Sequence, residues 1–79
     1  MKLKEKYEIY KIISKNIKKY RLKKNLTQKE FAKKCGYSHS YIKKIEGSNS
    51  PNNYSILTLY NISLALDIEL KSLFEDNNI

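Results

Sequence analysis

Residues 39–46, HSYIKKIE, carry polar and basic side chains at a spacing that a helix would sort onto one side. If Ile42 and Ile45 face a core, four polar side chains point outward or lie at the flank: His39, Ser40, Lys43 and Lys44. Lysine can donate to guanine O6 or N7, serine to several bases, and imidazole to a purine N7 or a phosphate. When a helix enters the major groove of DNA, its start lies nearest the base edges. We therefore predict base contacts by His39, Ser40 and Lys44. Lys43 is predicted to contact phosphate, and the alternative at each position is a solvated side chain.

Other residues are candidates for contacts with the phosphate backbone of DNA. Gln28 opens another predicted helix, and the free N–H groups and positive dipole at a helix start favour a phosphate. Four lysines near this helix are candidate phosphate contacts, weak singly and stronger as a group: Lys23, Lys24, Lys29 and Lys33. For Gln28 the alternative is an ordinary exposed residue of a first helical turn.

The charge is unevenly distributed along the 79 residues. Residues 1–44 hold fourteen lysines and one arginine against three acidic residues, a net charge of +12. Residues 45–79 hold one lysine against five acidic residues, a net charge of −4. Such a field attracts a polyphosphate to one half of the molecule. The alternative is that the lysine excess only reflects a chain rich in Lys, Asn and Ile.

The elements that must position these residues are predicted to be five helices in a single all-α domain, residues 1–79. Two Gly and one Pro leave little material for the tight turns of a sandwich or barrel. Residues 5–24 form the first helix, with one apolar stripe: Ile9, Ile13, Ile17 and Tyr20. Asn25 suits the left-handed residue that often follows a helix end.

Two short capped helices with a glycine between them follow. Thr27 and Glu30 have the T-x-x-E spacing of a capping box, and Ser38 is a good cap for the next helix. Gly36 supplies a positive φ in the turn at little steric cost. This arrangement is typical of a helix-turn-helix, here over residues 27–46.

The remaining residues predict a loop and two further helices. GSNSPNNY, residues 47–54, is rich in turn-forming residues. Ser55 can cap a fourth helix that runs through Leu66, with an apolar side made of Ile56, Leu59, Ile62 and Leu66. A last helical turn or two covers residues 69–75.

Over residues 13–74, from ISKNIKKYRLKKNLTQKEFAKKCGYSHSYIKKIEG through SILTLYNISLALDIELKSLF, the chain resembles the lambda-repressor-like, xenobiotic-response-element (Cro/repressor-type) family of transcriptional regulators. The resemblance implies a five-helix DNA-binding bundle, as in the small single-domain members. It places His39, Ser40 and Lys44 at base-reading positions. It also implies that Gln28 contacts the DNA backbone and braces the recognition helix. Three loop residues are implied to approach the sugar-phosphate backbone: Asn49, Asn52 and Asn53.

The resemblance also implies a structural ion pair and a dimer surface. Relatives pair an arginine of the first helix with the glutamate that closes the third, here Arg21 and Glu46. Arginine suits bidentate pairing with a carboxylate, and a DNA contact by Arg21 is the alternative. Leu57, Tyr60 and Leu64 form a second apolar stripe on the fourth helix. Because the family dimerises through its C-terminal helices, these three residues and Leu73 are interface candidates; the alternative is that the start of the first helix covers them.

Other chemistry finds little support. One His and one Cys cannot supply the three or four ligands of a usual metal site, and no nucleotide-binding or nucleophile motif is present. We therefore predict no metal, no cofactor and no enzymatic activity, with Cys35 packing as a small apolar residue. The single cysteine and the charges that interrupt every apolar stretch predict a cytoplasmic protein without a membrane span.

Together these observations predict a sequence-specific regulator that binds double-stranded DNA as a homodimer on a pseudo-palindromic operator, acting as a repressor. A restriction–modification controller-type activator is one alternative. Another is an antitoxin or other protein-interaction module whose DNA binding is secondary.

Overall fold

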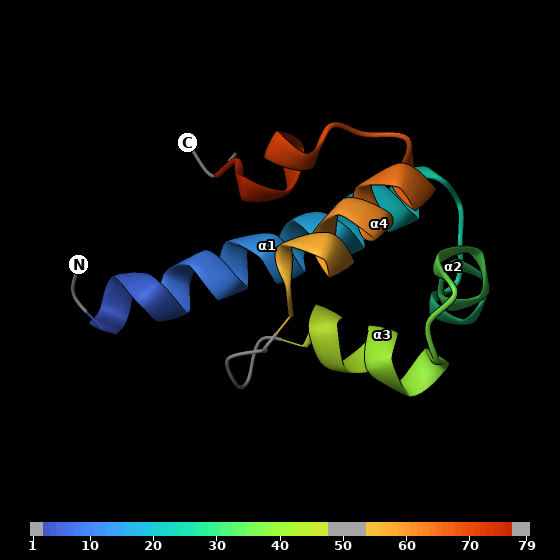
Figure 1. Ribbon diagram of the computed structural model, residues 1–79, viewed down its shortest axis with the longest axis horizontal. Helices are drawn as coiled ribbons and strands as arrows, with labels where there is room; N and C mark the ends of the chain where they lie inside the picture. The colour runs from blue at the N-terminus through green and yellow to red at the C-terminus, as the bar shows by residue number, and fades with distance from the viewer. Residues whose placement is uncertain (1–2, 48–53, 77–79) are drawn as a thin grey trace.

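The computed structural model describes residues 3–47 and 54–76, with side chains from Glu8 onward. This part of the chain forms four α-helices and a 3-10 helix, without strands: α1 (Leu3–Lys23), α2 (Gln28–Cys35), α3 (His39–Glu46), α4 (Ile56–Leu66) and η1 (Leu70–Phe74). In Figure 1, α1 crosses the middle of the molecule, α4 lies in front of it, α3 below and η1 above. The all-α prediction is confirmed. The fifth predicted helix is instead a five-residue 3-10 helix.

All five elements contribute to one cluster of buried apolar side chains. Its members are Ile13, Ile17, Phe31, Ala32, Ile42, Ile45, Leu59, Ile62, Ala65, Leu66 and Leu73. On α1 the predicted stripe faces this core, with Ile9 and Tyr20 packed at its margin. Ile56, predicted on the core side of α4, is 65 % exposed. On a helical wheel its position falls about 60° outside the arc formed by Leu59, Ile62 and Leu66.

η1 is anchored in the core from two sides. It packs against both α1 and α4, and Leu73 is fully buried there. The prediction that Leu73 lies at a dimer interface is therefore wrong. Asn16 of α1 also holds this segment, because its Nδ2 donates to the carbonyl oxygens of Leu73, at 2.8 Å, and Glu75, at 2.7 Å.

The helix starts follow the capping pattern predicted from the sequence. At α2 the Glu30 backbone N–H donates to Thr27 Oγ1 at 3.0 Å, and the Thr27 N–H donates to Glu30 Oε1 at 2.8 Å. This capping box lowers the pKa of Glu30, because the backbone N–H and the side-chain hydroxyl of Thr27 both hydrogen-bond to its carboxylate. Ser38 and Ser55 cap α3 and α4 through side-chain oxygens that accept a backbone N–H at 3.1 Å.

Three residues adopt the left-handed conformation at helix ends: Asn25 (φ 58°), Gly36 (φ 82°) and Asp67 (φ 56°). At the end of α2 the N–H groups of Gly36 and Tyr37 both donate to the Ala32 carbonyl at 3.0 Å. Gly36 thereby turns the chain sharply, so that α3 begins only four residues after α2 ends.

Replacing Gly36 with alanine is expected to lower the free energy of unfolding by about 1–2 kcal/mol, because an L-residue at positive φ brings its Cβ against its own backbone. A Cβ added at Gly36 would meet no other atom within 4 Å, so the loss comes from backbone conformation alone. Gly36→Asn is the matched control and should lose less, since asparagine tolerates this conformation. Urea denaturation measures the three proteins; equal losses for Ala and Asn would contradict this account.

Candidate DNA-binding interface

α3 presents its polar side to solvent. Ile42 and Ile45 are 0 % and 1 % exposed, packed in the core, whereas the four polar residues selected from the sequence are all exposed: His39, Ser40, Lys43 and Lys44. The orientation predicted for this helix is thus confirmed. Its start is fixed by the Ser38 cap, and its end, at Glu46, by a buried network. α3 therefore presents hydrogen-bond donors at the surface on a helix that is held at both ends.

The network at the end of α3 contains the ion pair predicted between Arg21 and Glu46. Arg21 Nε donates to Glu46 Oε2 at 2.7 Å and Nη2 to Oε1 at 3.1 Å, and the two side chains are 7 % and 2 % exposed. The third guanidinium nitrogen, Nη1, donates to the Leu26 carbonyl at 2.7 Å. Because all three guanidinium nitrogens are committed inside the molecule, Arg21 braces α3 and does not point toward a ligand.

Gln28 belongs to the same network. Its Nε2 donates to Glu46 Oε1 at 3.1 Å, so one carboxylate oxygen accepts from both Arg21 and Gln28. Gln28 is the first residue of α2 and is half-buried. The start of α2, where N–H groups favour a phosphate, is therefore tied directly to the end of α3.

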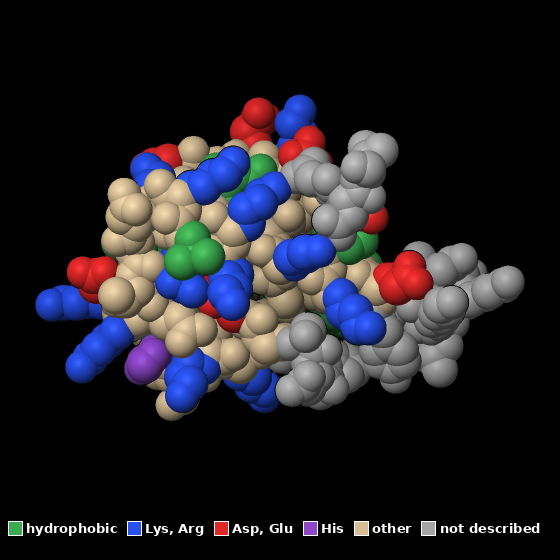
Figure 2. Space-filling view, turned by 180° about the vertical axis from the view of Figure 1, so that it is seen from behind, with side chains coloured by type: hydrophobic (Ala, Val, Ile, Leu, Met, Phe, Trp, Pro, Cys, Tyr) green, Lys and Arg blue, Asp and Glu red, His purple; other side chains and the backbone are tan. Residues whose placement is uncertain are grey.

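Many lysines lie on the surface around α2 and α3. Figure 2 shows them spread over the rear face, with His39, the one histidine of the chain, beside lysine side chains at its lower edge. Lys29 and Lys33 on α2 are exposed, as is Lys23, whose Nζ lies 5.4 Å from the centre of the Tyr20 ring. Lys34, not selected from the sequence, is exposed as well.

Lys24 differs from the other candidate lysines. Its Nζ forms an ion pair with the Asp67 carboxylate just after α4, and this hydrogen bond lowers the pKa of Asp67. Asp67 adopts the left-handed conformation, and the pair joins the ends of α1 and α4. Asn49, Asn52 and Asn53 lie outside the described residues.

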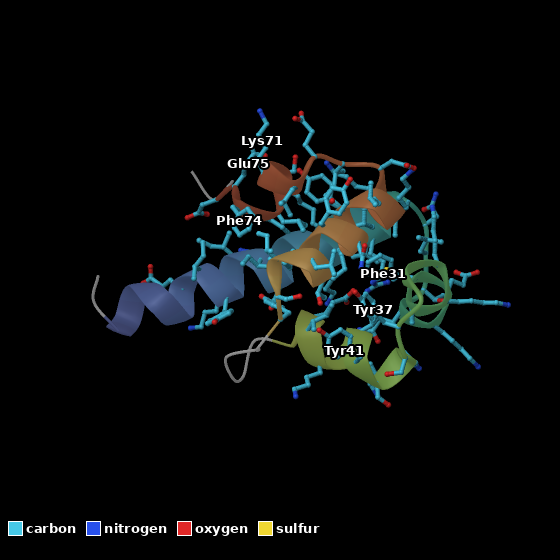
Figure 3. All side chains as sticks on the ribbon, in the orientation of Figure 1. Phe31, Tyr37, Tyr41, Lys71, Phe74 and Glu75 are labelled. Atoms are coloured by element: carbon cyan, nitrogen blue, oxygen red, sulfur yellow. The ribbon has the colours of Figure 1, made fainter. Side chains whose placement is uncertain are left out.

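The turn between α2 and α3 contains contacts that sequence reasoning missed. The Tyr37 hydroxyl accepts a hydrogen bond from Asn61 Nδ2 of α4 at 3.1 Å. The Tyr37 ring also packs against Tyr41, one turn into α3, with centroids 5.2 Å apart. Figure 3 shows both tyrosines in the region between α3 and α4. No local pattern identifies this hydrogen bond, because it joins residues 24 positions apart.

Cys35, the last residue of α2, packs against the core as predicted. Burial raises the pKa of its thiol to about 11, so the thiol stays protonated at neutral pH. Across the described residues, no three His, Cys, Asp or Glu side chains are grouped to hold a metal ion. In the same part of the chain, no helix has the length and apolar character needed to span a membrane.

The outer side of α4 carries an apolar stripe. Leu57, Tyr60 and Leu64 are 63 %, 49 % and 56 % exposed. The alternative that the start of α1 covers them does not hold for Tyr10, whose ring packs on Tyr54, with centroids 5.8 Å apart. All three side chains are therefore accessible on the same side of α4.

Two capped helices around a left-handed glycine, with a braced second helix whose polar face is exposed, define a helix-turn-helix protein. The chain matches the Helix-turn-helix family over residues 17–73 and belongs to it, as a lambda-repressor-like regulator. Regulators of this family bind double-stranded DNA, and a curated relative of the chain is itself a transcriptional regulator.

Individual relatives agree with this assignment. The chain is 34 % identical over 67 residues to the HTH-type transcriptional regulator SinR of Bacillus subtilis (strain 168), a match covering 85 % of this chain. The chain spans only 60 % of the length of that relative.

Solved structures show the same fold. The restriction-modification controller protein C.AhdI from Aeromonas hydrophila has a TM-score of 0.77 and 28 % identity, over 86 % of this chain and 96 % of that one. The hypothetical transcription factor NHTF from Neisseria has a TM-score of 0.81 at 20 % identity, over 87 % and 77 % of the two chains.

Proposed function

We propose that this chain represses transcription as a homodimer that binds a pseudo-palindromic operator and occludes polymerase, acting in the cytoplasm. The observation that carries the proposal is the exposed face of α3, where His39, Ser40 and Lys44 stand opposite the buried Ile42 and Ile45. In a symmetric dimer the two α3 helices would lie about 34 Å apart, one turn of DNA.

The remaining contacts proposed here position the protein without reading sequence. Phosphates would be contacted by Gln28, Lys23, Lys24, Lys29, Lys33, Lys43, Asn49, Asn52 and Asn53. Lysine suits this role as a flexible point charge. For Lys24, contact with phosphate requires release from Asp67, which holds it in the free protein.

Selection of bound sites from random duplexes tests the proposal, because it reports specificity, half-site spacing and symmetry together. We expect a pseudo-palindrome with half-sites separated by about one helical turn. A pool in which no sequence is enriched, or enrichment of a single asymmetric site, would overturn the dimeric operator model.

Salt titration on the selected site provides a second prediction. The slope of log K against log salt is expected to be steeper than about −3, because each phosphate contact contributes about −0.9. Filter binding from 50 to 300 mM salt measures it. A flatter slope would mean that too few of the proposed phosphate contacts form.

The exposed stripe of α4 is the proposed dimer surface. Replacing Leu57 and Leu64 with glutamine, which keeps helix propensity, is expected to weaken the dimer at least about tenfold, because burial of a leucine contributes about 1.5–3 kcal/mol. Sedimentation equilibrium measures the association. Leu22→Gln on α1 is the matched control, since Leu22 is 54 % exposed but lies outside the stripe. An unchanged dimer in the double variant would contradict this assignment.

A controller-type activator is a second candidate, supported by the likeness to C.AhdI, which extends over 96 % of that chain. A reporter placed downstream of the selected operator separates the two. Repression on expression of the protein supports our proposal, and activation supports the alternative.

A further inference from the structure

We propose that the hydrogen bond from Asn61 to Tyr37 sets the orientation of the reading end of α3 relative to α4, which makes Asn61 a positioning residue for DNA discrimination. This inference rests on the proposed function and adds to it a residue that never touches DNA.

Tyr37 is held by three helices at once. Its backbone N–H donates to the Ala32 carbonyl of α2 at 3.0 Å, and its hydroxyl accepts from Asn61 of α4 at 3.1 Å. Its ring packs on Tyr41 of α3, with centroids 5.2 Å apart; both side chains are labelled in Figure 3. Because Tyr37 precedes the His39 start of α3 by only two residues, a shift of its side chain moves the start of the recognition helix.

The hydrogen bond from Asn61 of α4 to Tyr37 depends on direction, whereas apolar packing does not. The core contacts among α2, α3 and α4 are made mainly by apolar side chains, which interact without the directional preference of a hydrogen bond. Within residues 8–47 and 54–76, the Asn61–Tyr37 bond is the side-chain hydrogen bond that links α4 to the helix-turn-helix. Both partners are half-buried, so loss of one removes a partly shielded hydrogen bond between the two elements.

Asn61 also directly follows Tyr60 of the proposed dimer surface. In the dimer, α4 would determine how far apart the two recognition helices stand. The Asn61–Tyr37 bond would then determine how each of them is tilted with respect to that spacing. A weaker link should therefore reduce sequence discrimination and also tolerate altered half-site spacing.

The experiment compares wild type with Tyr37→Phe, Asn61→Ala and the double variant. Each is titrated against the selected operator, a non-operator duplex, and operators whose half-sites are one base pair closer or further apart. The main readout is the ratio of operator to non-operator affinity, from which the folded fraction cancels. A purely structural role would change the melting temperature and leave this ratio unchanged.

Each single variant is expected to lower the ratio about three- to tenfold, in line with loss of one hydrogen bond. The double variant should lose no more than the worse single, and the penalty for altered spacing should shrink. Thr58→Ala is the matched control, because Thr58 Oγ1 hydrogen-bonds with Ser55, the N-cap of the same helix, at 3.1 Å and not with the helix-turn-helix.

Single variants that keep the ratio within twofold of wild type, or losses that multiply in the double variant, would overturn the inference. A wild-type protein that selects no sequence would instead overturn the proposed function.

Discussion

Binding to the selected operator is expected to weaken at least about 100-fold when Ser40 and Lys44 are both replaced with alanine. Each specific base contact contributes about 1–3 kcal/mol of discrimination, and a dimer makes each contact twice. Non-operator DNA should be bound less than about tenfold more weakly, since only one lysine per subunit is lost. Fluorescence anisotropy with both duplexes measures the two effects.

This variant should fold normally, because both side chains are exposed and surface replacements change stability by about 0.5 kcal/mol or less. Lys43→Ala is the matched control on the same helix. As a proposed phosphate contact, it should weaken operator and non-operator binding by similar factors. A footprint that is unaltered in the Ser40/Lys44 variant would rule out base reading by α3.

The second large effect concerns stability. Glu46→Ala is expected to lower the free energy of unfolding by about 3–5 kcal/mol, because it leaves the buried Arg21 guanidinium without its carboxylate. In a domain of this size, that corresponds to a fall in melting temperature of at least about 12 °C. Gln28 loses its acceptor in the same substitution. Thermal denaturation followed by circular dichroism measures the change.

The paired replacement Arg21→Met with Glu46→Leu separates the charge from the packing. Removing both charges together is often close to neutral, so most of the stability should return. DNA affinity should remain reduced, because the Gln28 side chain still has no carboxylate to orient it. If the paired variant were as unstable as Glu46→Ala, the loss would reflect packing instead of an unpaired charge.

Local patterns predicted the parts of the structure that depend on nearby residues. Thr27 with Glu30, Ser38 and Gly36 each act within a few positions of themselves, and the structure has the caps and turn expected of them. The outward side of α3 followed from Ile42 and Ile45, because helical periodicity relates neighbouring side chains. The Arg21–Glu46 pair spans 25 positions, and only the family resemblance indicated it.

Features that depend on packing between distant segments were not predicted. Leu73 was predicted to lie at an interface, but in η1 it is buried in the core where η1 packs against α1 and α4. Asp67 forms an ion pair with Lys24, 43 positions away. Asn16 donates hydrogen bonds to carbonyl oxygens more than 55 positions along the chain. The Asn61–Tyr37 contact is of the same kind. Such pairings require the tertiary arrangement, which periodicity and capping do not supply.

The separation of roles along α3 has a practical consequence. Ile42, Ile45 and Glu46 anchor α3 in the bundle and face inward. His39, Ser40, Lys43 and Lys44 are exposed, and within the described part of the chain no side-chain hydrogen bond ties them to the bundle. Under the proposed function, exchanging these outward side chains should change the DNA site that is selected while leaving the fold intact. The trio of Arg21, Gln28 and Glu46 has no such freedom, since one carboxylate oxygen accepts from two donors and a change at Glu46 alone deprives both of them.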